Sequence, residues 1–220
     1  MDNNIDAVKI THRTYDSIAS GYSSRIGSLI ADSWVGEFER VLMDEFLLLM
    51  TLSSPSVLDI SCGNGKDANY LRQKDAVTVA ADISLGMIKE ASRISSECVL
   101  CQMDMRNLGF AGDSFDGVWA DGCIYHIPKA ELSRLLNEIA RVLKPSGIFS
   151  FNLKIGDGEK LEETPRSYQG GPRFYAYYNN SEIGEYLMNT GFELLAMCKY
   201  PRRIFDEEII HLWCSKPATV

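Results

Sequence analysis

A short apolar run that ends in a glycine turn is the first place in this sequence where the residue types suggest chemistry. Ser56–Ile60 is typical of a buried strand, and Gly63 and Gly65 follow it within a few residues. Glycine lets a backbone turn sharply and approach a ligand closely, and the helix expected next offers unpaired N–H groups at its start. The pattern therefore predicts a ligand site at the carboxyl end of this strand.

Carboxylates mark the ends of three successive apolar runs. Asp59, Asp82 and Asp104 each lie at or just after the end of an expected strand. Asp82 comes 19 residues after Gly63, a spacing at which a carboxylate can accept hydrogen bonds from both hydroxyls of a ribose. Asp104 could accept a hydrogen bond from the exocyclic amine of a purine, so the three strand ends together predict a nucleoside site. Two structural alternatives stay open, because Asp82 could cap the next helix and Asp104 could begin a turn.

The same turn also fits a dinucleotide-binding pattern. Residues 63–68 read Gly-Asn-Gly-Lys-Asp-Ala and satisfy G-x-G-x-x-[G/A], so a nicotinamide cofactor is an alternative. Asp59 counts against it, because a negative charge beside a pyrophosphate is unfavourable. The same carboxylate could instead hold the ammonium group of a ligand, directly or through water. The last strands of the chain also differ from a second mononucleotide-binding half.

Strand-like and helix-like segments alternate through the middle of the chain. Strands are expected at 57–60, 77–82, 98–103, 115–120 and 148–153, and the clearest helix is expected over 129–143. This alternation predicts an α/β fold with a mostly parallel sheet covered by helices on both faces. A shorter helix or lid over 14–25 precedes it, as does a helix that begins near Asp32 or Ser33 and carries an apolar stripe over 34–49. A polar, irregular segment over 154–171, an aromatic cluster over 174–178, a helix over 181–190 and strands over 192–198 and 209–214 follow it.

Composition narrows the class of protein. The 220 residues include 22 Lys and Arg against 30 Asp and Glu, a net charge of −8, and 45% are apolar. A globular domain is therefore expected, and a nucleic-acid partner is not, because phosphate binding favours a basic surface. The longest apolar stretch is too short to span a membrane, and no signal peptide is evident. The six cysteines are expected to be reduced thiols in the cytoplasm, and the single C-x-x-C predicts no metal site.

Five segments, in order, resemble the motifs of one family. They are VLDISCGNGKD, ADISLGMIKEA, CQMDMRNLGF, SFDGVWADGCIYHI and RVLKPSGIFSF. In this combination the sequence resembles class I S-adenosylmethionine-dependent methyltransferases of the small-molecule type. The resemblance implies one Rossmann-like domain over 1–220, with seven strands in the order 3-2-1-4-5-7-6 and the last strand antiparallel. Within it are expected N-terminal lid helices (1–52), a cofactor-binding core (53–153), a substrate-side insert (154–180) and a final helix with a strand pair (181–220).

The resemblance also implies which residues hold the cofactor. These are Asp59, Ser61, Gly63 and Gly65 for its methionine part, Asp82 for the ribose, Ile83, Met87, Asp104 and Met105 for the adenine, and Tyr15 and Tyr22 in an aromatic segment that closes over it. Ser61 departs from the family pattern, which usually has glycine there, so its side chain must be fitted against the cofactor. Met87 could instead be a core residue, and the two tyrosines could simply pack the lid onto the sheet.

The methyl acceptor is expected beyond the fourth strand, at 120–126. His126 is the candidate base, because hydroxyl and protonated amine acceptors need one, and Asp121 could orient an acceptor or contact the cofactor. His126 could equally be a hydrogen-bonded loop residue. Substrate contacts are expected from a set of aromatic side chains and one arginine that could receive a flat or anionic molecule, or could form an ordinary core cluster: Tyr125, Tyr168, Arg173, Phe174, Tyr175 and Tyr178.

These features predict an enzyme that moves a methyl group from S-adenosylmethionine to an oxygen or nitrogen atom of a small metabolite, leaving S-adenosylhomocysteine. Two alternatives are kept. One is an NAD(P)-dependent oxidoreductase. The other is a methyltransferase-like binding protein without activity, although a protein without activity has no need of Asp59, Asp82 and Asp104 together.

Overall fold

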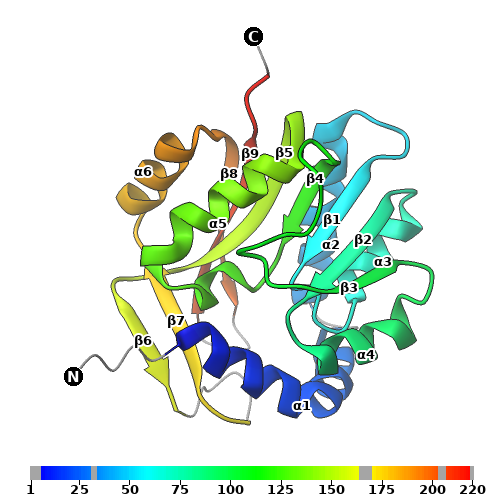
Figure 1. The fold of residues 1–220 in the computed structure, drawn as a ribbon, viewed down its shortest axis with the longest axis vertical. Helices are drawn as coiled ribbons and strands as arrows, with labels where there is room; N and C mark the ends of the chain where they lie inside the picture. The colour runs from blue at the N-terminus through cyan, green and yellow to red at the C-terminus, as the bar shows by residue number, and fades with distance from the viewer. Residues whose placement is uncertain (1–5, 31–33, 164–169, 203–206, 219–220) are drawn as a thin grey trace.

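Five parallel strands form the centre of a twisted sheet. The computed structural model describes residues 6–30, 34–163, 170–202 and 207–218. In it the sheet runs in the order β3-β2-β1-β4-β5 (Figure 1). The strands are β1 (Ser56–Ile60), β2 (Val77–Asp82), β3 (Val99–Gln102), β4 (Phe115–Ala120) and β5 (Leu143–Ile155). Their register pairs Asp59 with Ala80 and Asp82 with Gln102, so the carboxyl ends of β1, β2 and β3 meet at one edge.

The sheet continues beyond β5 with two antiparallel pairings. β9 (Glu207–Ser215) pairs antiparallel with β5, and β8 (Glu193–Arg202) pairs antiparallel with β9. The main sheet therefore has the order 3-2-1-4-5-9-8. β8 and β9 take the places of the expected strands 6 and 7, so the expected order with an antiparallel last strand is confirmed.

A strand hairpin replaces the irregular segment expected after residue 154. β7 (Arg173–Tyr178) pairs parallel with the end of β5, and β6 (Glu159–Glu162) pairs antiparallel with β7, which brings the described strands to nine. β5 also begins at Leu143, earlier than expected. Its register jumps by several residues between its pairings with Phe115 and Gly117, so Pro145 and Gly147 lie in an irregular start of the strand and not in a loop before it.

Helices cover both faces of the sheet, and the side-chain period of two explains how. α5 (Lys129–Val142) and α6 (Asn180–Thr190) pack on the face that carries Leu58, Val118 and Phe149. α2 (Trp34–Met50) and α3 (Lys66–Gln73) pack on the other face, with Phe46 against Trp119. α4 (Leu85–Ile94) lies beside α3, and the two helices share a small apolar cluster with the strand β2. No helix of the described residues is long and apolar enough to cross a membrane.

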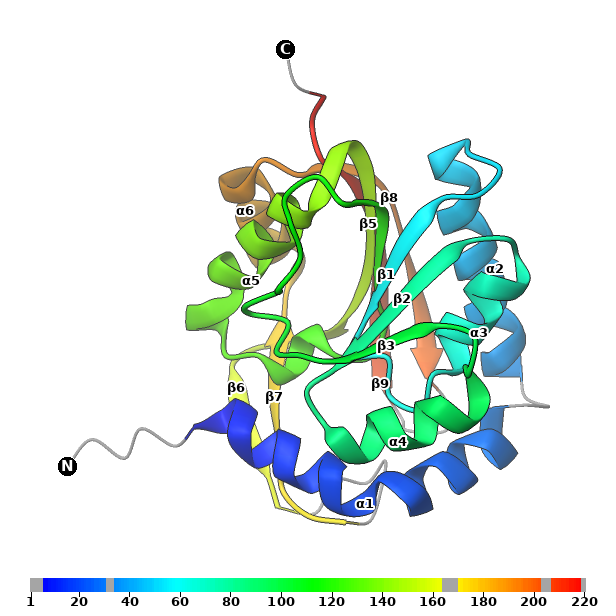
Figure 2. The same cartoon turned by 45° about the vertical axis from the view of Figure 1, so that its right-hand side comes forward.

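The first helix crosses the carboxyl edge of the sheet. α1 (Ala7–Ile30) is longer than the helix expected over 14–25, and it runs along α4 and past β7 (Figures 1 and 2). A Cβ on Gly86 would lie 2.7 Å from the Asp16 carbonyl oxygen, so this crossing requires glycine. The Asp16 carboxylate accepts hydrogen bonds from the Gly86 N–H (2.7 Å) and the Ser84 hydroxyl (2.9 Å). α1 is thereby fixed to the start of α4.

Candidate active site

The glycine turn after β1 contains three left-handed residues. Ser61, Gly63 and Gly65 have φ angles of 55°, 54° and 81°. A Cβ on Gly65 would lie 2.5 Å from the Ser95 hydroxyl oxygen, so internal packing requires this glycine. A Cβ on Gly63 would meet no protein atom within 4 Å, so the chain itself leaves space there for a ligand. Ser61 adopts a conformation that costs a residue with a side chain about 1–2 kcal/mol.

Asp82 lies at the end of β2 with both carboxylate oxygens facing backbone donors. It accepts hydrogen bonds from the N–H groups of Gly63 (2.9 Å) and Ser84 (2.8 Å). Burial raises the pKa of Asp82 to about 6, although these two N–H groups act to lower it. Helix α4 is capped by Ser84, whose hydroxyl accepts from the Met87 N–H, and not by Asp82. Each oxygen of Asp82 keeps a lone pair that could accept from a ligand hydroxyl.

Among the strand-end aspartates of the described residues, Asp59 has an incomplete set of hydrogen bonds. It is 2% exposed, and its Oδ2 atom has no hydrogen-bond partner. Burial and the nearby Asp67 carboxylate raise its pKa well above the ordinary value. A buried carboxylate oxygen is normally satisfied, and an ammonium group beside it would both bond it and favour its ionised form. The donor set therefore fits a ligand with a positively charged amine.

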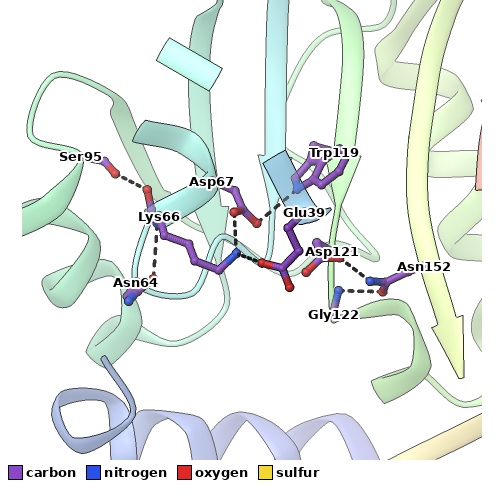
Figure 3. A network of polar contacts seen from close by, with 10 residues as sticks. Glu39, Asn64, Lys66, Asp67, Ser95, Trp119, Asp121, Gly122 and Asn152 are labelled. Atoms are coloured by element: carbon purple, nitrogen blue, oxygen red, sulfur yellow. Dashed lines mark hydrogen bonds and ion pairs between the residues drawn. The ribbon is translucent and has the colours of Figure 1, made fainter. Parts of the chain in front are cut away.

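A partly buried ion-pair network of Glu39, Lys66 and Asp67 (Figure 3) acts electrostatically on Asp59. Lys66 Nζ lies 3.0 Å from Glu39 Oε2 and 2.6 Å from Asp67 Oδ1, and the Trp119 indole N–H donates to the second Asp67 oxygen (3.3 Å). Burial acts to lower the pKa of Lys66, but the Asp67 and Glu39 carboxylates raise it well above its ordinary value. This network was not predicted from the sequence, because Glu39 lies in α2 and no local pattern indicates that it pairs with Lys66.

Asp121 is held at the end of β4 by the neighbouring strand. Its carboxylate accepts a hydrogen bond from the side-chain amide of Asn152, whose oxygen accepts from the Gly122 N–H (2.8 Å) (Figure 3). Asp121 also contributes to the raised pKa of Asp59, so the two carboxylates share one electrostatic environment. The predicted position of Asp121 beside the cofactor residues is consistent with this geometry.

Asp104 is engaged by an arginine two residues later. Arg106 donates to Asp104 from Nη2 (2.7 Å) and Nε (3.1 Å to Oδ1), and its Nη1 reaches Glu131 of α5 (2.7 Å). Burial acts to raise the pKa of Asp104, but the hydrogen bonds from Arg106 bring it below the ordinary value. The Arg106 N–H also donates to Asp104 (2.9 Å), so Asp104 does begin a turn. Oδ1 thus accepts from two donors, whereas Oδ2 accepts from Nη2 and shares Nε (3.2 Å), so Oδ2 is the oxygen that can accept from a ligand.

The other expected adenine neighbours lie at the same end of the sheet. Met87 is buried in the first turn of α4, and Ile83 and Met105 are partly buried against the main core. Sequence reasoning did not single out Arg106, although its two-residue spacing from a strand-end aspartate was visible.

Tyr15 and Tyr22 of α1 both lie over this edge. Their rings meet edge to face at 5.7 Å, and the Tyr15 hydroxyl lies 3.1 Å from His126 Nε2. Farther along α1, the Ser23 hydroxyl accepts from the Asn64 side chain in the glycine turn (3.3 Å). α1 therefore touches both the glycine turn and the end of β4.

His126 has both ring nitrogens in hydrogen bonds. Nδ1 lies 2.7 Å from the Phe174 carbonyl oxygen, which can only accept, so Nδ1 carries the proton and Nε2 accepts from Tyr15. Burial lowers the pKa of His126 to about 3, although the Phe174 carbonyl acts to raise it. The ring is therefore neutral near pH 7, and to act as a base it would have to release the Tyr15 hydroxyl. The geometry therefore shows His126 as a residue that is hydrogen-bonded within the fold.

The predicted substrate residues divide between the two faces of β7. Arg173 and Tyr175 face α1 and His126: the Arg173 guanidinium lies 4.9 Å from the Tyr15 ring centre, and the Tyr175 ring lies 4.9 Å from His126. Tyr125 joins them, with its ring 6.0 Å from that of Tyr175.

Tyr178, also predicted to contact the substrate, lies apart from these residues, because strand alternation turns it to the opposite face of β7. It lies in the main core, with Lys129 Nζ 5.0 Å from its ring centre and the Tyr186 ring 6.4 Å away. Phe174 lies partly buried against the same core, and Tyr168 is outside the described residues.

The fold and these carboxylates define a Rossmann-like domain with a nucleoside-type site at the carboxyl edge of its sheet. Residues 57–147 match a family model described as a methyltransferase domain. Residues 57–147 therefore form a methyltransferase domain, in agreement with the resemblance to class I S-adenosylmethionine-dependent methyltransferases.

Individual relatives agree with this family. Methyltransferase GfsG of Streptomyces halstedii is 34% identical over 116 residues, covering 50% of this chain and 41% of that protein. A malonyl-[acyl-carrier protein] O-methyltransferase of Methylovorus sp. (strain MP688) is 27% identical over 201 residues, covering 86% of this chain and 64% of that protein. The chain thus spans less than two thirds of the length of these two relatives.

A solved structure shows the same fold over nearly the whole chain. Magnesium protoporphyrin IX methyltransferase (ChlM) from Synechocystis PCC 6803, determined with bound S-adenosylmethionine, aligns with a TM-score of 0.72 at 17% identity. The alignment covers 98% of this chain and 100% of that one.

Proposed function

We propose that this protein is an enzyme that transfers a methyl group from S-adenosylmethionine to an oxygen or nitrogen atom of a small molecule. The observation that carries the proposal is the unpartnered, buried Oδ2 atom of Asp59, in the same electrostatic environment as Asp82 and beside the turn where Gly63 leaves space. The family of the chain supports it, and so do the names of its relatives. The net charge of −8 favours a small molecule over a nucleic acid.

Each strand end has a part in holding the cofactor. Asp59 bonds the ammonium group, and Gly63 allows the methionine part to lie against the turn, with Ser61 and Gly65 shaping the backbone on either side. Asp82 accepts from the ribose hydroxyls. Asp104 accepts from the adenine amine and Met105 offers its N–H, while Ile83 and Met87 provide apolar contacts. When bound, S-adenosylmethionine supplies a methyl group already activated by its positively charged sulfur.

The chain then has to position an acceptor and exclude water. Such orientation lowers the activation barrier by about 7–11 kcal/mol in favourable cases. Tyr15 and Tyr22 cover the site from α1. The Tyr15 hydroxyl donates a hydrogen bond to His126, which fixes its position. Asp121, held by Asn152, orients the acceptor or the cofactor's amine.

Calorimetry with S-adenosylhomocysteine tests the proposal. The wild-type protein should bind it with micromolar affinity, and Asp59→Asn should bind at least about tenfold more weakly, because one charge-assisted hydrogen bond is lost. Asp116→Asn is the matched control, since Asp116 lies at the opposite end of the sheet and pairs with Lys144 (2.8 Å). Its affinity should match the wild type.

Three results would contradict the proposal in different ways. Equal affinity in Asp59→Asn would remove the ammonium assignment. Preference for NADH would favour the oxidoreductase. Tight binding without transfer of labelled methyl to any compound of a metabolite extract would favour a binding protein.

A further inference from the structure

The turn after β3 carries an arginine that bridges two carboxylates at the expected adenine end of the site. Arg106 lies two residues after Asp104, and its guanidinium joins that aspartate to Glu131 in the first turn of α5. Nη2 lies 2.7 Å from Asp104 Oδ2, and Nε lies 3.1 Å from Asp104 Oδ1. The planar edge of the guanidinium therefore meets both carboxylate oxygens, which is the arrangement that fixes the plane of a carboxylate most firmly.

The hydrogen bonds from Arg106 leave one acceptor position on Asp104. Oδ1 accepts from the Arg106 backbone N–H (2.9 Å) and from Nε, which together use its two lone pairs. Oδ2 accepts from Nη2 and shares the Nε hydrogen at 3.2 Å. One lone pair of Oδ2 remains, so the aspartate is oriented to accept from a single further donor.

The same contacts keep Asp104 in its ionised form. Burial acts to raise the pKa of Asp104, but the hydrogen bonds and the charge of Arg106 bring it below the ordinary value. The hydrogen bond to Asp104 in turn raises the pKa of Arg106, so both members of the pair are charged near pH 7. An ionised carboxylate has only acceptor oxygens, whereas a protonated one presents a hydroxyl donor.

The segment after β3 is fixed to α5 at two separate places. Arg106 forms the first, through Nη1 and Glu131 Oε2 (2.7 Å). The second lies farther along, where the Leu108 N–H donates to Glu138 (2.7 Å) and Arg141 donates to the Leu108 carbonyl oxygen (2.9 Å). Only the first place touches the strand-end aspartate. Removal of the Arg106 side chain therefore releases that aspartate, whereas removal of the Arg141 side chain loosens the same segment and leaves the aspartate held.

We propose that Arg106 is a positioning residue for the cofactor: it holds Asp104 so that the remaining lone pair of Oδ2 accepts from the exocyclic amine of adenine. This inference rests on the proposed function, in which Asp104 bonds that amine. Arg106 acts through Asp104, and Glu131 holds the far end of the guanidinium. A site built to bond a ligand N–H discriminates against a ligand that lacks it, because the polar group of the site is then left unpaired.

Two ligands that differ only in the amine test the inference. Calorimetry measures the dissociation constants of S-adenosylhomocysteine and of its 6-deamino analogue, in which a hydrogen atom replaces the amine. The wild-type protein should bind the analogue at least about tenfold more weakly, because a hydrogen bond to a charged group is lost. In Arg106→Met this ratio should fall to within about threefold, because Asp104 is no longer oriented. Partial unfolding weakens both ligands equally, so the ratio does not depend on how well the variant folds.

Three further variants separate positioning from general support of the segment. Arg141→Met is the matched control, because Arg141 fixes the same segment without touching Asp104, and its ratio should equal that of the wild type. Arg106→Lys should give an intermediate ratio, since an ammonium group bonds one carboxylate oxygen but does not bond both from one plane. In Asp104→Ala the ratio should be close to one, and the addition of Arg106→Met should not change it, because the two residues act as a unit.

Each contrary result has a distinct meaning. A wild-type ratio in Arg106→Met would overturn the inference. An equal fall in Arg141→Met would also overturn it, because support of the whole segment would then set the preference for the amine. A ratio near one in the wild type would remove the amine contact on which the inference depends. Failure of S-adenosylhomocysteine itself to bind the wild type would instead overturn the proposed function.

Discussion

Replacing Asp82 by asparagine should change how the stability of the protein depends on pH. The pKa of this carboxyl rises from 3.8 to about 6 on folding, because the side chain is buried at the end of β2. The folded state therefore holds the Asp82 proton more tightly than the unfolded state does. The resulting stability is present below the unfolded pKa of 3.8 and is lost as the pH rises through about 6.

The magnitude follows from the two pKa values. A difference of about two pKa units is worth about 3 kcal/mol, of which about 2 kcal/mol falls between about pH 4.5 and about pH 7.5. Asparagine cannot titrate, and it keeps only one of the two acceptor oxygens that bond Gly63 and Ser84. The stability lost with that hydrogen bond does not depend on pH. It therefore shifts the difference between the wild type and Asp82→Asn by a constant and leaves the pH dependence of that difference unchanged.

Urea unfolding of the two proteins at a series of pH values measures the effect. The free energy of unfolding of the wild type, relative to the variant, should fall by about 2 kcal/mol over that interval. Affinity for S-adenosylhomocysteine should move in the opposite direction: it should rise with pH in the wild type, because ionised Asp82 accepts from both ribose hydroxyls. The variant should bind at least about tenfold more weakly near neutral pH. A stability difference that is flat with pH, or equal affinities, would refute the reasoning.

Three further substitutions probe separate parts of the structure. Ser61→Gly should raise the free energy of unfolding by up to about 1 kcal/mol, because φ is 55° there, and unchanged urea unfolding would count against backbone strain. Gly86→Ala should loosen α1 despite the better helix propensity of alanine, since its Cβ would meet the Asp16 backbone at 2.7 Å, and limited proteolysis within α1 should become faster. Tyr178→Phe should leave activity unchanged and stability equal or up to about 2 kcal/mol higher, because the buried hydroxyl has no hydrogen-bond partner. A loss of substrate affinity in that last variant would restore Tyr178 to the acceptor site.

The parts of the fold that were predicted correctly carry local signals. The apolar runs of β1 and β2 end at the residues expected, and α5 follows Pro128 and lasts almost to the predicted residue. Carboxyl ends of neighbouring parallel strands must meet at one edge, so the grouping of Asp59 with Asp82 followed from topology alone.

The hairpin β6–β7 was missed because its polar first strand has no apolar alternation. Its second strand does alternate, with Arg173 and Tyr175 on one face and Tyr178 on the other, and this period of two could have excluded Tyr178 from the acceptor site.

The contacts that decide the chemistry are between segments far apart in the chain. Lys66 pairs with Glu39 across 27 positions, and His126 bonds Tyr15 across 111. A single sequence gives no signal for such pairs. Burial lowers the pKa of His126, and β7 and α1 supply its hydrogen-bond partners Phe174 and Tyr15, so the proposed base is a neutral residue bonded within the fold.

Titration of S-adenosylhomocysteine into the wild-type protein, with NADH titrated in parallel, tests the central claim most directly. A cofactor site built from Asp59, Asp82 and Asp104 predicts micromolar binding of S-adenosylhomocysteine and no measurable binding of NADH. Binding of NADH alone, or of neither compound, would contradict it.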